Sequence, residues 1–171
     1  MELLVNLLEN MLDVDEKVLI FTQYVKMGEI IQDLISKKFR TDVLFLHGSQ
    51  SRKEKEKVIN TFQENPEYKI LVATLKTGGT GLNLTAAQNV IHYDLWWNPA
   101  VENQATDRVH RIGQENDVMV YRFITKGTLE EGIDEILKSK TDLAEKTIST
   151  DKTFITELSN EKLKELLRLR L

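Results

Sequence analysis

The sequence predicts an open, doubly wound α/β domain with a parallel sheet of about five or more strands, followed by a helical region. Short apolar runs alternate with segments in which apolar residues recur every three or four positions. The runs are apolar on both faces, as in strands that helices cover on both sides. Right-handed β-α-β crossovers then give an open sheet, which binds ligands beyond the carboxyl ends of its strands.

The expected elements follow in chain order. Strand-forming runs occupy residues 18–21, 43–46, 70–73, 90–93 and 118–124, and helical spacing covers residues 4–11, 27–35 and 50–63. Asn98 and Pro99 suit the N-cap and first position of a further helix, which we expect to run through Arg111. Thr128 and Glu131 form a capping-box pattern, and helical spacing continues beyond them. We therefore divide the chain into an α/β domain at residues 1–126 and a helical appendage, packed on it, at residues 127–171.

The composition excludes several classes of function. The 171 residues include 23 Lys and Arg against 27 Asp and Glu, so the net charge is −4 and any nucleic-acid contact would be local. The absence of cysteine excludes disulfides, thiolate catalysis and cysteine metal sites. No apolar run approaches the roughly 20 residues that a membrane-spanning helix needs.

A glycine-rich segment follows the third strand, between Thr74 and Asn83. Three glycines in four positions allow sharp turns and close approach to a ligand, and Lys76 adds a positive charge. The segment is not a P-loop, because Lys76 precedes the glycines. The alternative interpretation is an ordinary strand-to-helix turn.

Two further segments offer groups that suit phosphate. On the helix after Pro99, Gln104, Arg108 and Arg111 are spaced i, i+4, i+7, which would place an amide and two guanidiniums on one face. The alternative is a solvated face that pairs with acids of the same helix. Residues 48–53 open a helix with serine hydroxyls, Arg52 and Lys53, which suits a phosphate or simply capping. No acidic pair is placed to hold Mg²⁺, so these groups resemble half of a bipartite site.

Taken in order, these motifs resemble the second RecA-like lobe of a superfamily-two DNA translocase ATPase of the Swi/Snf type, with a prokaryotic character. Residues 18–23 resemble motif IV, and residues 46–49 the segment after the next strand. Residues 74–84 read T-L-K-T-G-G-T-G-L-N-L and resemble motif V. Residues 104–114 resemble motif VI, and residues 97–99, W-N-P, are typical of this family. Thr77 departs from the pattern, in which alanine is common.

The resemblance implies a role for each matching position. Arg108 and Arg111 would be arginine fingers that stabilise charge on the phosphoryl group of ATP, with Gln104 near the γ-phosphate. Gly81 and Asn83 would approach the ribose of the nucleotide. The residues expected to contact one DNA strand, mostly at phosphates, are Gln23, Gly48, Arg52, Thr74, Lys76, Thr77, Gly78 and Trp97.

The resemblance also implies cofactors and partners. ATP and Mg²⁺ would be held mainly by the N-terminal RecA-like lobe of the full-length protein, so this chain alone would hydrolyse ATP negligibly. The other partners would be double-stranded DNA and a protein–DNA complex as remodelling target, with no membrane. The location would be cytoplasmic and nucleoid-associated in a prokaryote, or nuclear in a eukaryote.

Three alternatives differ in testable ways. The second lobe of an RNA helicase shares the fold and the arginine pair, but its motif VI usually has histidine where Gln104 stands. A non-catalytic module that binds DNA or protein would tolerate loss of the arginines. The sugar-nucleotide half of a glycosyltransferase also has an open α/β lobe, but it gives no reason for two arginines at this spacing.

Overall fold

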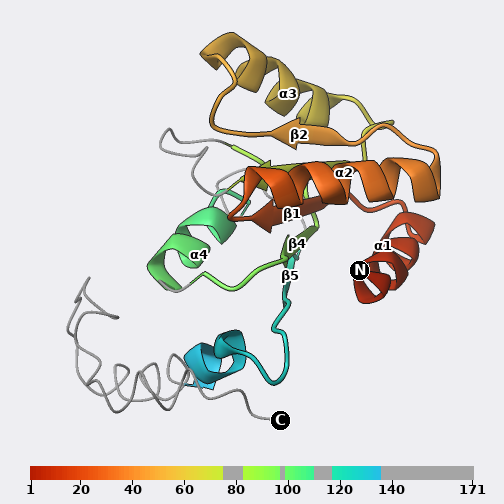
Figure 1. The fold of residues 1–171 in the computed structure, drawn as a ribbon. Coiled ribbons are helices and arrows are strands. Elements are labelled where there is room, and N and C mark those ends of the chain that lie inside the picture. The colour runs from red at the N-terminus through yellow and green to blue at the C-terminus, as the bar shows by residue number, and fades with distance from the viewer. Residues whose placement is uncertain (75–82, 97–98, 110–116, 136–171) are drawn as a thin grey trace.

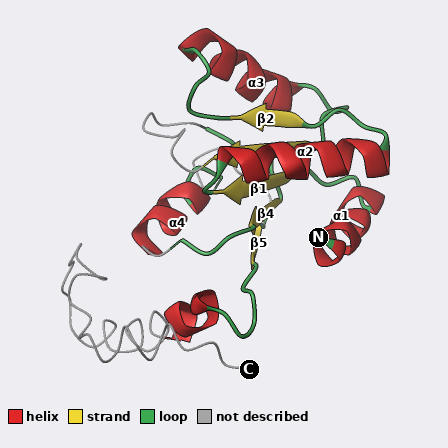
Figure 2. Ribbon diagram, viewed as in Figure 1, coloured by secondary structure: helices red, strands yellow, loops and turns green. Residues whose placement is uncertain are grey.

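The computed structural model describes residues 1–74, 83–96, 99–109 and 117–135, and Figure 1 draws the other residues in grey. The elements are α1 (Glu2–Asp13), β1 (Val18–Thr22), α2 (Val25–Phe39), β2 (Leu44–Leu46), α3 (Arg52–Glu64), β3 (Ile70–Thr74), β4 (Asn89–His92), α4 (Pro99–Thr106) and β5 (Met119–Arg122). Residues 129–135 are also helical. Helices and strands alternate along the first part of the chain, as predicted (Figure 2).

The five strands form one parallel sheet in the order β2-β3-β1-β4-β5. The central strand β1 pairs with β3 and β4, so that Phe21 lies opposite both Ala73 and His92. His92 in turn lies opposite Arg122 of β5. Because all strands point the same way, the residues that follow them gather at one edge, and the predicted parallel α/β fold is confirmed.

Helices cover both faces of the sheet. Leu19 and Phe21 of β1 face a core that α3 and α4 complete with Phe62 and Ala105. The alternate residues of β1 face a second core, to which α1 contributes Leu4, Leu8 and Met11 and α2 contributes Ile31 and Ile35. All five residues of β1 are buried, as the doubly apolar sequence run requires.

Local chemistry sets where individual helices lie. Ser51 accepts a hydrogen bond from the Glu54 backbone N–H, and the Glu54 carboxylate accepts one from the Ser51 N–H, so a capping box starts α3. In α2, Gly28 passes so near β2 that an added Cβ would lie 2.5 Å from the Phe45 ring. A glycine at this position therefore lets helix and sheet approach closely.

Helix α4 ends earlier than the sequence predicts. It stops at Thr106 rather than continuing through Arg111. The backbone N–H groups of Arg108 and Val109 donate to carbonyls three residues earlier, which tightens the chain into turns. The Arg108 carbonyl accepts from the Leu84 N–H at 3.0 Å. This tertiary bond takes an acceptor that a longer helix would use internally.

Part of the helical appendage packs on the sheet domain. Leu129 and Ile133 contact Leu95, which follows β4. The predicted capping box is present in altered form: Thr128 accepts from the Glu130 N–H, whereas Glu131 accepts from the N–H of Gly127 rather than of Thr128. The division at residue 127 and the packing of the later appendage stay predictions, since residues 136–171 lie outside the described part.

Candidate nucleotide and nucleic-acid interface

At the carboxyl end of the central strand, Asp94 joins β1 to the segment after β4. Its carboxylate accepts hydrogen bonds from the Thr22 hydroxyl, at 2.5 Å, and from the Gln23 backbone N–H, at 2.8 Å. The Gln23 side chain donates from Nε2 to the Leu95 carbonyl at 2.7 Å. Burial raises the pKa of Asp94, while these hydrogen bonds oppose the rise. Gln23, predicted to contact DNA, thus already holds the segment after β4.

The turn after β2 leaves Gly48 on the surface. Gln50 fixes the turn, since its side chain accepts from the His47 N–H and donates to the Phe45 carbonyl. Lys55 donates from Nζ to the Gly48 carbonyl at 3.2 Å. Among the described residues, no heavy atom comes within 4 Å of a Cβ built on Gly48, so packing alone does not require glycine there. An open glycine beside a helix N-terminus suits close approach by a ligand.

Arg52 and Thr74, both predicted DNA contacts, differ in exposure. The Arg52 side chain is 92% exposed and pairs with Glu56 at 2.8 Å. Such an exposed pair contributes little, so the guanidinium can exchange this partner for a phosphate at small cost. Thr74 ends β3 and is buried. Direct contact between Thr74 and DNA would therefore require its side chain to become exposed.

The residues after the glycine-rich segment are held by α3. Gln63 donates from Nε2 to the Asn83 carbonyl at 3.2 Å and to the Thr85 hydroxyl at 3.3 Å, and its Oε1 accepts from the Ala86 N–H at 2.7 Å. The Asn83 side chain is exposed. Because the Leu84 N–H donates to the Arg108 carbonyl, the last residue of motif V is directly joined to the interior of motif VI.

Two of the three residues of the predicted polar face on the helix after Pro99 lie in the described part of the chain. Gln104 is exposed, but Arg108 is only 7% exposed, because the chain has left the helical path before it. Ala105 and Val109 are buried against the sheet. An Arg108 side chain that reaches a ligand on another lobe must therefore rotate out of the position seen here.

Both ends of α4 are tied to neighbouring strands. Near its start, Glu102 accepts from the Trp96 N–H and from the Arg122 guanidinium, each at 3.0 Å. At its end, the Thr106 hydroxyl lies 3.0 Å from Nε2 of His92. Burial raises the pKa of Glu102, and the two hydrogen bonds oppose the rise. The sequence offered Glu102 as a partner for arginines of its own helix, and instead it pairs with Arg122 of β5.

Six predicted site residues lie outside the described part of the chain: Lys76, Thr77, Gly78, Gly81, Trp97 and Arg111. Three residues that organise the site were not singled out as site residues from the sequence: Gln63, Asp94 and Arg122. Only Asp94 carried a signal, because it closely follows an apolar strand. Its partner Thr22 becomes evident only when β1 and β4 are known to be neighbours.

Two of the predicted ligand-facing residues present exposed amides. Gln104 and Asn83 can donate from these amides to oxygen atoms of a ligand, whereas Arg108 would first have to leave its buried position. In the described ranges, no group of three or more His, Asp and Glu residues could hold a metal.

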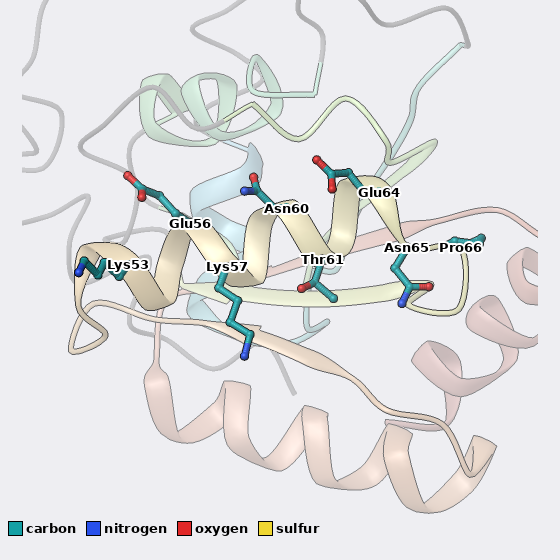
Figure 3. A pocket seen from close by; sticks show the side chains of 8 residues that line it. All are labelled: Lys53, Glu56, Lys57, Asn60, Thr61, Glu64, Asn65 and Pro66. Carbon is teal, nitrogen blue, oxygen red and sulfur yellow. The ribbon is translucent and has the colours of Figure 1, made fainter.

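A shallow hollow of about 730 Å³ lies on the outer face of α3 (Figure 3). Its lining mixes lysines with glutamates, so it has no dominant charge. None of the predicted site residues lines it.

No helix in the part of the chain that the structure describes has the length and apolar character needed to cross a membrane.

Comparison with known proteins agrees with this geometry. The family described as the helicase conserved C-terminal domain matches residues 1–113. The Bacillus subtilis (strain 168) protein named "Putative ATP-dependent helicase/translocase YwqA" is 54% identical over 155 residues, which cover 91% of this chain and 17% of that protein. The SWI2/SNF2 ATPase core domain of Sulfolobus solfataricus superposes with a TM-score of 0.81 at 46% identity, over 98% of this chain and 34% of that one. The same core in complex with dsDNA gives a TM-score of 0.80, over 98% and 35% of the two chains.

The class of protein follows from the open parallel sheet, the helices on its two faces and these matches. It is a second, RecA-like lobe of the kind found in SNF2-type helicase-like ATPases. The chain belongs to the helicase conserved C-terminal domain family. It spans about a sixth of the length of the Bacillus relative and about a third of the archaeal ATPase core.

Proposed function

We propose that this chain is the second motor lobe of an ATP-dependent double-stranded DNA translocase. The observation that carries the proposal is the bond between Leu84 and Arg108, which joins the segment after Asn83 to the segment that carries the arginines. Two segments that the family resemblance directs toward ATP are thereby held together. The dsDNA complex of the archaeal relative supports the nature of the second ligand.

In this proposal the chain positions donors around ATP and contributes no metal ligand. Bound ATP would supply the phosphoryl group whose transfer to water releases free energy. Asn83 would contact the ribose, with Gly81 beside it, and Gln104 would lie near the γ-phosphate. Arg108 and Arg111 would donate to phosphoryl oxygens as negative charge develops on them. Mg²⁺ would be held by the first lobe of the full-length protein.

The chain would contact DNA mainly through phosphates. Gly48 and Arg52 are exposed at one end of the site, and Arg52 gives up only a weak surface partner. Lys76, Thr77, Gly78 and Trp97 complete the proposed contact, together with Gln23 and Thr74. Contacts to phosphate carry no direct sequence information, so the lobe can follow duplex DNA of any sequence.

The test joins this chain covalently to the first lobe of an SNF2-type relative and measures ATP turnover with and without duplex DNA. We expect DNA-stimulated turnover in the joined protein and negligible turnover by the chain alone. Arg111→Ala should lower the rate by about 10³–10⁵, the range for loss of an arginine finger. A loss under roughly tenfold removes Arg111 from this role, and stimulation by RNA in preference to duplex DNA favours the RNA-helicase alternative.

A further inference from the structure

Arg122 joins three separate elements at the end of β5. Its Nε donates to Glu102 of α4 at 3.0 Å, and its Nη1 donates to Asp134 of the helix at residues 129–135, also at 3.0 Å. Both carboxylate side chains are only 7% exposed, whereas the Arg122 side chain is 32% exposed. One guanidinium therefore bridges two largely buried carboxylates from elements that are distant in the sequence.

This arrangement differs in kind from the surface ion pairs of the molecule. Removing one member of a largely buried ion pair costs more than removing an exposed one, so the position of Arg122 bears on both acids. The planar fork of arginine can direct separate N–H groups at two acceptors, which a lysine ammonium does less well. A shift of the helix at residues 129–135 therefore changes the hydrogen bonding available to α4.

The position of Arg122 in the sheet strengthens the connection. Its register partner is His92, and His92 contacts Thr106 at the other end of α4. Glu102 also accepts from the Trp96 N–H, so the segment before α4 depends on the same carboxylate. The placement of α4, which carries Gln104 and leads into Arg108, is thus set by two adjacent strand ends and by Asp134.

We propose that Arg122 is a positioning residue that couples the C-terminal helical region to α4, so that the Arg122–Asp134 contact sets how Gln104 and Arg108 are presented to ATP. The catalytic part of this inference rests on the function proposed above. The mechanical part, in which Asp134 stabilises α4 through Arg122, concerns this chain alone and can be tested without ATP.

The first experiment measures hydrogen–deuterium exchange of the chain by mass spectrometry. Asp134→Asn weakens one arm of the bridge and changes no residue of α4 itself. We expect exchange over residues 101–108 to accelerate about five- to thirtyfold, as for loss of one charge-assisted hydrogen bond. Arg122→Gln should accelerate the same residues at least as much.

The control is Lys69→Gln, which removes an ion pair between two other segments distant in the sequence, the 2.8 Å contact of Lys69 with the exposed Asp15. It should leave exchange over residues 101–108 unchanged. The mechanical proposal is overturned if Asp134→Asn accelerates exchange over residues 129–135 alone. It is equally overturned if the control accelerates exchange in α4 as strongly, because the effect would then be general destabilisation.

The second experiment uses the joined two-lobe protein. Asp134→Asn should lower kcat for ATP roughly tenfold with a change of less than about threefold in KM, since misplacing a group that acts in the transition state lowers kcat rather than ground-state binding. A kcat within about twofold of the parent overturns the catalytic coupling. A parent protein without DNA-stimulated turnover instead contradicts the proposed function, and the exchange experiment still decides whether Arg122 couples the two helices.

Discussion

Acidification should destabilise this protein through His92. The side chain is buried at the end of β4, stacks on Phe21 with ring centroids 5.5 Å apart and lies beside Arg122. Among the described residues, its Nδ1 has no hydrogen-bond partner, so a protonated ring would leave a buried N–H donor unsatisfied. Burial, and then the charge of Arg122, lower the pKa of His92 to about 4 from 6.5.

The size of the effect follows from linkage. Below its ordinary pKa of 6.5, the histidine binds a proton in the unfolded chain, while in the folded protein it stays neutral down to about pH 4. The unfolded state therefore takes up more protons, and stability falls as the pH falls through this window. A shift of this size corresponds to about 2 kcal/mol lost between pH 8 and pH 5, at 1.36 kcal/mol per pKa unit.

Urea unfolding at pH 8 and at pH 5 tests this prediction in the parent and in His92→Gln. Glutamine keeps a polar group that can reach Thr106 and does not titrate. The loss of unfolding free energy between the two pH values should be smaller in the variant by about 2 kcal/mol, whatever its stability at pH 8. Carboxylates contribute equally to both proteins, so they cancel in this difference. An equal loss in the two proteins would refute the reasoning.

Three further predictions concern local packing and capping. Gly28→Ala gains about 1 kcal/mol of helix propensity but places a methyl group against the Phe45 ring, so we expect a net loss of about 1–2 kcal/mol of unfolding free energy in urea. Adding Phe45→Leu should recover most of this loss, and a stabilised single variant would contradict the close approach of α2 to β2. Ser51→Ala should cost about 1 kcal/mol in the same assay by removing the cap of α3, and no loss would show that the capping box contributes nothing. Gln63→Glu sets a carboxylate oxygen against the Asn83 carbonyl and should cost about 1–3 kcal/mol, whereas Glu64→Gln on the exposed side should cost little. Equal effects would contradict a specific role for the amide.

The features that the sequence predicts correctly are those that nearby residues determine. Capping by a serine is one of the two expectations for residues 48–53, and Ser51 does cap α3, joined to Glu54 three positions on; the buried strands are visible as apolar runs. The end of α4 could not be predicted in this way. It depends on a hydrogen bond between Leu84 and Arg108, and a favourable helical pattern continues past the point where that bond ends the helix.

The contacts that organise the site join residues far apart in the sequence. Thr22 and Asp94 are 72 positions apart, and Arg122 is 20 positions from Glu102. Which side chains meet depends on the strand order, in which β1 lies between β3 and β4 and β5 lies beside β4. The expectation of a parallel sheet did not include that order. The sequence could therefore place Asp94 after a strand without identifying what it binds.

The predicted DNA contacts differ in whether they can bind a phosphate without rearrangement. Gly48 and Arg52 are exposed and can meet a phosphate without rearrangement. Gln23 already donates to Leu95, and Thr74 is buried, so Gln23 can bind DNA only by giving up a hydrogen bond and Thr74 only by becoming exposed. Breaking a buried hydrogen bond costs more than exchanging a surface ion pair. We therefore expect Arg52→Ala to weaken DNA binding directly, and Gln23→Ala to act by releasing the segment that leads into α4.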